Sequence, residues 1–171
     1  MKSNKQPDDF IFTLATDSDA HLLAGLLTDA MHYKVEHGDE TWGSEDYSDK
    51  EAAELIALCP IYLVKSGAEA LGTVALQTED KSWTERPGDA LYLHRIAVAA
   101  SARGQNLGKR IIDWALAQTA ESGRQFLRLD CDSRNAGLCA YYEKQGFNQV
   151  GTKQSTRNPN YLAALFEQST P

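Results

Sequence analysis

The sequence predicts an α/β fold in which helices flank a mixed sheet. Segments rich in β-branched and aromatic residues alternate with segments whose apolar residues recur at helical spacing. A strand at 90–98, a helix at 105–121 and a strand at 126–131 follow one another, and this order requires the two strands to run parallel. The segments 61–65 and 71–78 are close enough in sequence to form an antiparallel hairpin. The sheet is therefore expected to contain both strand directions.

The first half of the chain is predicted to hold a strand, two helices and the hairpin. The apolar segment 10–15 is strand-like, and the polar residues 16–19 cap a helix that Gly38 ends. One broad face of that helix carries Leu22, Leu23, Leu26, Leu27, Ala30 and Met31. Ser48 and Glu51 have capping-box spacing for a short helix that runs through Leu58 and ends before Pro60.

The second half begins with a loop that holds Trp83 and leads into the strand at 90–98. The helix at 105–121 ends at Gly123. After the strand at 126–131, a short helix precedes Gly146. The segments 147–152 and 161–166 are predicted to be two closing strands.

Composition favours a compact enzyme of the reducing cytoplasm. At 171 residues we expect a tail at 1–9 and one domain at 10–171. No apolar run approaches the ~20 residues of a membrane span, and the N-terminus lacks the apolar core of a secretory signal. The net charge of −7 argues against nucleic-acid and anionic-membrane partners. Cys59, Cys131 and Cys139 have no metal-binding spacing and are expected to be free thiols, so no metal is predicted.

The most informative segment is the loop 103–110, whose sequence is Arg-Gly-Gln-Asn-Leu-Gly-Lys-Arg. Cations at the start of a helix oppose the helix dipole unless an anion binds there. Glycines allow a phosphate to approach the backbone, and the free N–H groups of the helix start can donate to it. The spacing fits neither the nucleoside-triphosphate loop nor the dinucleotide fingerprint. An ordinary glycine-containing turn would explain the loop alone equally well.

A second motif runs from Asn135 to Phe147. Asn135 is a good N-cap, Gly146 is a good C-terminal residue, and Tyr142 lies two turns into the helix. Taken alone, Tyr142 is equally explained as a buried aromatic. The two motifs together resemble the Gcn5-related N-acetyltransferases (GNAT), whose acyl-CoA loop has Arg or Gln, two residues, Gly, one residue, and Gly or Ala. Asn106 replaces the inner glycine of that pattern, and Asn tolerates left-handed backbone well.

The resemblance implies the GNAT fold, a largely antiparallel mixed sheet with one parallel pair at two splayed strands and about four flanking helices. It implies acetyl-CoA as the acyl donor. It also implies that the backbone of Ile96 and Val98 binds the pantetheine arm of the cofactor. The further cofactor-binding residues expected from it are Arg103, Gly104, Gln105, Asn106, Leu107, Gly108, Lys109, Asn135 and Tyr142.

The chemistry that follows is direct attack of an amine on the thioester. Tyr142 is the candidate acid that protonates the departing sulfur. His94 is the candidate base, because its position resembles that of a histidine in arylalkylamine acetyltransferases and strand alternation puts it on the face of Ile96. A single histidine on a strand is more often a packed, hydrogen-bonded residue. Glu36, His37, Asp130 and water remain alternatives for removing the proton of the amine.

The acceptor is predicted to be a small cationic amine or a peptide amine. The segment between the first two helices is acidic, and Trp42 and Tyr47 lie within it. Such a segment attracts cations, although a solvated acidic loop explains it equally well. Its acidic residues are Glu36, Asp39, Glu40, Glu45, Asp46, Asp49, Glu51 and Glu54. Two other classes of function stay open, a non-catalytic acyl-CoA sensor and a protein-interaction module, as does assembly into a homodimer.

Overall fold

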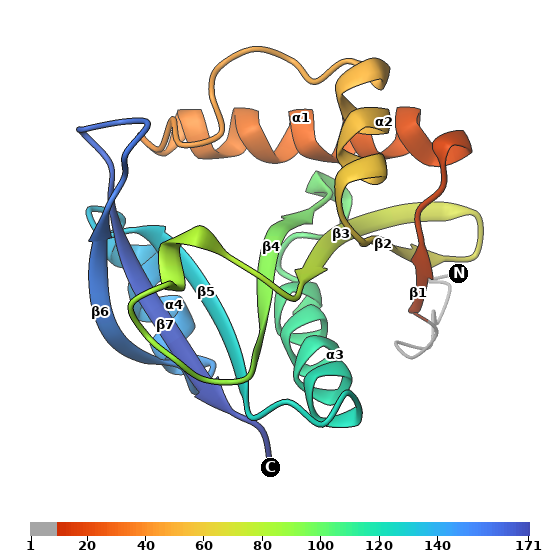
Figure 1. The fold of residues 1–171 in the computed structure, drawn as a ribbon. Helices are drawn as coiled ribbons and strands as arrows, with labels where there is room; N and C mark the ends of the chain where they lie inside the picture. The colour runs from red at the N-terminus through yellow and green to blue at the C-terminus, as the bar shows by residue number, and fades with distance from the viewer. Residues whose placement is uncertain (1–9) are drawn as a thin grey trace.

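A computed structural model describes residues 10–171 and shows one seven-stranded sheet with helices on both faces (Figure 1). The predicted tail at 1–9 lies outside the described residues. The strands lie in the order β1-β2-β3-β4-β5-β7-β6. Their bounds are β1 Ile11–Leu14, β2 Ile61–Ser66, β3 Glu69–Gln77, β4 Ala90–Val98, β5 Phe126–Asp132, β6 Asn148–Gln154 and β7 Leu162–Ser169.

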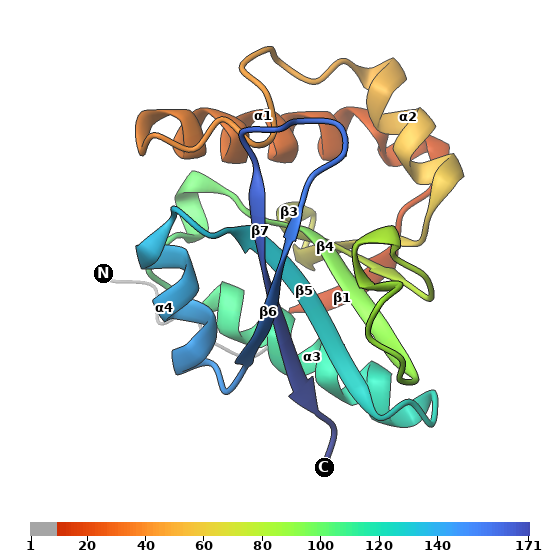
Figure 2. The same ribbon diagram turned by 60° about the vertical axis from the view of Figure 1, so that its left-hand side comes forward.

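Four α-helices cover the sheet, two on each face. They are α1 Ala20–Glu36, α2 Asp49–Leu58, α3 Leu107–Glu121 and α4 Ala136–Lys144, with short 3₁₀ helices at Asp17–Asp19, Lys81–Trp83 and Ala100–Ala102. Helices α1 and α2 pack on one face and α3 and α4 on the other, as two views of the ribbon show (Figure 2). Within residues 10–171, no helix is both long and apolar enough to cross a lipid bilayer.

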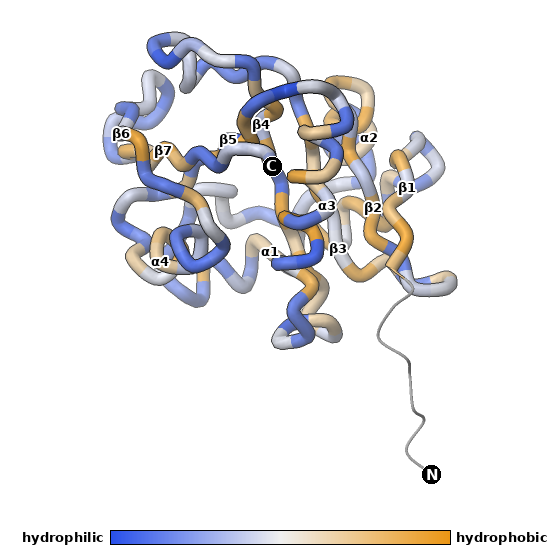
Figure 3. Tube along the Cα trace, turned by 90° about the horizontal axis from the view of Figure 1, so that it is seen from below, coloured by the Kyte–Doolittle hydropathy of each residue, from blue (hydrophilic) through white to orange (hydrophobic). Residues whose placement is uncertain are grey.

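Burial of the sheet on both faces explains the apolar runs in its strands. The neighbouring residues Leu63 and Val64 are both fully buried, but Leu63 packs against α1 and α2, and Val64 packs against α3. A strand whose two faces are both covered cannot alternate apolar and polar residues. Figure 3 shows the result as apolar stretches along the central strands.

Most of the predicted elements are confirmed, including their capping residues. The Ser48 hydroxyl accepts a hydrogen bond from the Glu51 N–H at 3.2 Å, and the Glu51 carboxylate accepts one from the Ser48 N–H at 2.8 Å. Gly38 follows α1 with a φ of +78°, a conformation that glycine adopts without strain. Helix α3 begins at Leu107, two residues later than predicted, because the turn of the loop extends to Asn106.

The closing strands are longer than predicted, and their order was not predicted. Strand β7 lies between β5 and β6, and it pairs with β5 along seven residues from Asp132 to Phe126. The last strand in sequence thus becomes an interior strand. The turn between β6 and β7 reaches up to the level of α1 in both views (Figures 1 and 2).

A buried ion pair fixes the loop before β4 against β5 and β7. The Arg128 side chain is 1% exposed, and its Nε donates to Glu167 Oε2 at 2.7 Å. Its remaining nitrogens donate to the carbonyl oxygens of Arg86 and Pro87 at 3.0 and 3.1 Å. Full pairing of this kind compensates the loss of water around a buried guanidinium.

Candidate functional site

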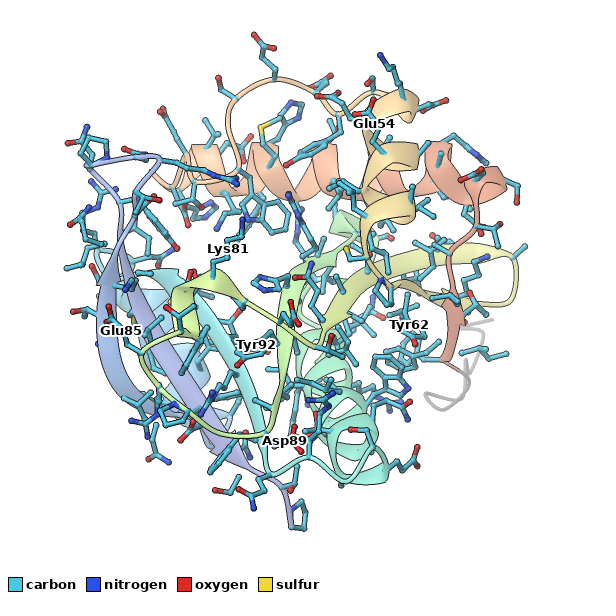
Figure 4. All side chains as sticks on the ribbon, viewed as in Figure 1. Glu54, Tyr62, Lys81, Glu85, Asp89 and Tyr92 are labelled. Carbon is cyan, nitrogen blue, oxygen red and sulfur yellow. The ribbon has the colours of Figure 1, made fainter. Side chains whose placement is uncertain are left out.

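A cavity of about 850 Å³ opens where β4 and β5 separate. The two strands pair in parallel only from Ala90–Phe126 to Tyr92–Arg128, although both continue further. Figure 4 labels Tyr92, which belongs to this last pair, between β4 and β5. The cavity is lined by the C-terminal part of α1, the loop before α3, the ends of β4 and β5, helix α4 and the β6–β7 turn. The predicted splay of the two strands is therefore confirmed.

A β-bulge in β4 shapes one wall of the cavity. Ala75 pairs with His94 and Thr73 pairs with Ala97, so that Arg95 and Ile96 together face one residue of β3. Arg95 has a φ of +54°, which is rare for a residue with a side chain. A bulge of this kind leaves one residue outside the ladder, so a backbone N–H becomes available to a ligand.

The bulge corrects one step of the sequence analysis. Strand alternation was expected to place His94 and Ile96 on one face, but alternation does not hold through the extra residue. Both side chains nevertheless line the cavity, as does Val98. The bulge could not be read from the sequence, because no glycine marks it.

The loop before α3 has the backbone that phosphate binding requires. Gly104 and Asn106 adopt φ values of +75° and +65°, and Asn106 is the N-cap of α3. Among residues 10–171, nothing lies within 4 Å of the place where a Cβ of Gly104 would be. The first N–H groups of α3 have no partner within the helix, and the helix dipole favours an anion beside them. The loop therefore fits a diphosphate such as that of coenzyme A.

Asn106 is expected to be replaceable by glycine but not by alanine. Its side chain makes no capping hydrogen bond, so the left-handed backbone alone selects the residue. The Asn106→Ala variant should lose roughly 1–2 kcal/mol of unfolding free energy, because a left-handed conformation costs that much for an ordinary residue. Asn106→Gly should stay close to the parent, and urea denaturation of both variants checks this. Equal stability of the two variants would contradict the prediction.

The side chains of the loop are held by the protein itself. Arg103 lies 3.2 Å from Asp29 Oδ2 and stacks over the Tyr33 ring, while Lys109 pairs with Asp113 at 2.6 Å. Arg103, Gly104, Asn106, Leu107, Gly108 and Lys109 line the cavity. The Gln105 side chain does not line it and instead donates to the Ser101 carbonyl oxygen at 2.7 Å.

Helix α4 positions the candidate acid. Tyr142 is buried between Phe147 and Phe166 and lines the cavity. Burial raises the pKa of its hydroxyl above the usual value, and Cys131 adds to the rise. The hydroxyl therefore keeps its proton at neutral pH.

Asn135 also lines the cavity, but both ends of its amide are engaged by the protein. Its oxygen accepts from the Leu138 N–H at 3.0 Å as the predicted N-cap, and its nitrogen donates to Asp39 Oδ2 at 3.2 Å. Asp39 is held in turn by Lys34 at 2.6 Å. Burial would raise the pKa of Asp39, but hydrogen bonds from Lys34 and Thr41 outweigh it and lower the pKa to about 2.

His94 and Asp130 lie at one level on the two diverging strands. Each is two residues beyond the last pair, Tyr92 and Arg128, and parallel strands advance together. Asp80 approaches from the loop after β3, with its Oδ2 2.9 Å from His94 Nε2, although the ring N–H is not aimed at that oxygen. The other Asp80 oxygen accepts from the Ser82 N–H at 2.7 Å.

Sequence reasoning missed Asp80 and Tyr161 as members of this group. Tyr161 lies at the end of the β6–β7 turn, and its hydroxyl donates to Asp130 Oδ2 at 3.1 Å. Both residues come from loops whose paths depend on the whole sheet, so no local pattern indicates them. Asp130 was named only as an alternative, although its place near the carboxyl end of a parallel strand was a usable signal.

Several side chains of the acidic segment between α1 and α2 are engaged by the protein itself. Asp46 contacts His32 at 2.7 Å, Glu51 caps α2, and Asp39 pairs with Lys34. The aromatic side chains are also engaged, because Arg95 stacks over Trp42 and donates to the Tyr47 hydroxyl at 3.1 Å. Of the eight acidic residues, only Asp39 and Glu40 line the cavity.

Known proteins share this architecture. The model of the acetyltransferase (GNAT) family matches residues 25–147. The uncharacterized N-acetyltransferase YesJ of Bacillus subtilis is 26% identical over 163 residues, which cover 86% of this chain and 87% of YesJ. A GNAT-family acetyltransferase from Listeria monocytogenes superposes with a TM-score of 0.75 at 24% identity, covering 94% of each chain.

A second similar structure was solved with a ligand. It is yncA, a putative acetyltransferase of Salmonella typhimurium with its cofactor acetyl-CoA, which has a TM-score of 0.68 at 11% identity. The superposition covers 96% of this chain and 95% of yncA, and at this identity it concerns the fold.

The chain belongs to the GNAT family of acetyltransferases. The predicted fold class is confirmed, with a mixed sheet that has one parallel pair and with four α-helices. The chain is accordingly an acyltransferase that uses an acyl-CoA.

Proposed function

We propose that the protein transfers the acetyl group of acetyl-CoA to a primary amine, of a small cationic molecule or of a peptide, with Tyr142 as the acid. The observation that carries this proposal is the position of Tyr142. Its protonated hydroxyl belongs to a buried ring that lines the same cavity as the phosphate-binding loop and the β4 bulge. The structure of yncA, which has a similar fold, is described with acetyl-CoA as its cofactor.

Each wall of the cavity has one task in the reaction. The loop before α3 binds the diphosphate, which fixes the direction of the pantetheine arm along β4. The backbone at Ile96 and Val98 holds this arm, and an N–H freed by the bulge stabilises the negative charge that develops on the thioester oxygen. These contacts place the thioester carbon between the two strands.

Proton transfers complete the chemistry. His94 accepts a proton from the amine, and the Asp80 carboxylate, 2.9 Å from His94 Nε2, stabilises the positive charge that the imidazole gains. The amine nitrogen then bonds to the carbonyl carbon as the carbon–sulfur bond breaks, and Tyr142 gives its proton to the sulfur. The acylated nitrogen then loses its second proton, which returns through solvent to Tyr142, and His94 releases its proton to solvent, so that the enzyme is restored.

Acetyl-CoA should stabilise the folded protein, and amines should release free CoA from it. At a concentration one hundred times the dissociation constant, acetyl-CoA should add about 2.7 kcal/mol to the unfolding free energy. Thermal unfolding measures the first effect, and a thiol reagent measures CoA release across a panel of amines.

The two effects together separate the classes of function. Stabilisation without CoA release from any amine would favour an acyl-CoA sensor. The absence of stabilisation would favour a protein-interaction module and would contradict the proposal.

A further inference from the structure

In the part of the chain that the structure describes, the Asp130 carboxylate lacks a Lys or Arg partner, although it is partly buried and lines the cavity. Among residues 10–171, its one hydrogen bond comes from the Tyr161 hydroxyl, at 3.1 Å to Oδ2, and no Lys or Arg lies within ion-pair distance. A carboxylate that is removed from water is normally paired with a cation. This group is therefore incomplete in the absence of a ligand.

A second carboxylate increases the negative charge at the same place. One side-chain atom each of Asp80, His94 and Asp130 lies within 4.8 Å of the others. Even a protonated imidazole would neutralise only one of the two carboxylates. Burial raises the pKa of Asp130, and Asp80 raises it further, while His94 and Tyr161 lower it. A cation bound at this point would relieve both the desolvation and the repulsion.

The cations of the cavity do not serve this purpose. Arg103 pairs with Asp29, Lys109 pairs with Asp113, and both belong to the loop before α3. Lys34 is taken up by Asp39 on the α1 side of the cavity. Two further cations line the cavity: Arg95 donates to the Tyr47 hydroxyl and stacks over Trp42, and Arg157 is exposed on the β6–β7 turn. Among residues 10–171, none of these cations is paired with Asp130 or Asp80.

We propose that Asp130 and the Tyr161 hydroxyl form a subsite that binds the acceptor as an alkylammonium ion, with the nitrogen between Asp130 and His94. This inference rests on the proposed function and narrows the class of acceptor substrate. The substrate class is an aliphatic primary amine that arrives protonated, rather than an arylamine, an alcohol or a thiol. The subsite lies beside the bulge that is expected to hold the thioester, so the bound nitrogen is already near the carbon that it attacks.

Substituting Asp130 tests the subsite by its charge. Benzylamine, which is protonated at neutral pH, and aniline, which is neutral, are compared as acceptors in the Asp130→Asn variant by CoA release. The KM for benzylamine should rise about 10- to 100-fold, because an ammonium loses a charge-assisted hydrogen bond. Aniline should be affected much less, and Asp130→Glu should restore part of the preference for benzylamine. The KM for acetyl-CoA should stay unchanged.

The matched control is Asp132→Asn in the same strand. The Asp132 carboxylate is also buried but is paired with Arg134 at 2.8 Å, so its loss should leave the preference for benzylamine intact. Stabilisation by acetyl-CoA confirms that each variant is folded.

Three results would overturn the subsite. The first is a benzylamine KM within twofold of the parent in Asp130→Asn, and the second is an equal loss for benzylamine and aniline. The third is CoA release from arylamines but from no alkylamine, which would leave the proposed transferase activity standing. Absence of CoA release from every amine would overturn the proposed function itself, and the subsite with it.

Discussion

Replacement of Tyr142 by phenylalanine should slow CoA release about 100- to 10,000-fold, the range lost when a general acid is removed. The phenyl ring keeps the contacts with Phe147 and Phe166, so only the hydroxyl is lost. Because that hydroxyl acts on the departing sulfur, the effect should fall on kcat. The stabilisation by acetyl-CoA should stay near that of the parent. Steady-state kinetics and thermal unfolding with acetyl-CoA measure the two quantities.

The neighbouring Tyr141 provides the control. Its ring meets that of Tyr142 edge-on, and its hydroxyl lies 2.7 Å from the place where a Cβ of Gly108 would be. Tyr141→Phe removes the same atom from the same helix and should keep most of the turnover rate. If both variants were equally slow, the hydroxyl of Tyr142 would have no special role. If neither were slow, solvent would be the proton donor.

Replacement of Glu167 by glutamine should lower the unfolding free energy by about 3–5 kcal/mol, because it leaves the guanidinium of Arg128 buried without a counter-charge. The Arg128 side chain is enclosed by the rings of Trp83 and Phe126 at 4.9 and 5.4 Å, so water cannot replace the lost carboxylate. Urea denaturation at neutral pH measures the change.

A surface ion pair gives the matched control for Glu167. Glu85 lies 2.9 Å from Lys153 and is 82% exposed, and Figure 4 shows it on the loop beside β6. Glu85→Gln should cost no more than about 1 kcal/mol. Replacing both buried partners, as in Arg128→Met with Glu167→Leu, should recover much of the loss because no unpaired charge remains. Similar losses of unfolding free energy for Glu167→Gln and Glu85→Gln would show that burial of the ion pair does not increase the cost of breaking it.

Local signals were sufficient for the elements and for part of the site. Ser48 and Glu51 cap α2 as predicted, and Asn106 takes the left-handed conformation that its place in the loop implied. The loop before α3 and Tyr142 also line one cavity, as their motifs suggested. The caps and the left-handed turn depend on the backbone preferences of a few neighbouring residues, and these preferences can be read directly from the sequence.

Long-range partners could not be predicted in the same way. The bulge at Arg95 depends on how β4 fits β3, and the place of β7 between β5 and β6 depends on the pairing of all three strands. The charges gave the clearest contrast. The sequence suggested an acidic segment as the binding surface for a cation, but Asp39 of that segment pairs with Lys34, and of its eight acidic residues only Asp39 and Glu40 line the cavity.

By itself, the sequence determined the type and order of the elements, the loop before α3 and the two motifs that define the family, because backbone preference and hydrophobic period act over a few residues. Only the tertiary structure decided which charges are left unpaired. Within residues 10–171, Asp130 has no Lys or Arg beside it because β4 and β5 diverge at that level, and Asp80 faces His94 because the loop after β3 folds over the opening. The energy of two charges depends on the distance between them in space. Residues as far apart in sequence as Asp80 and Asp130 come close to one another only when the sheet forms.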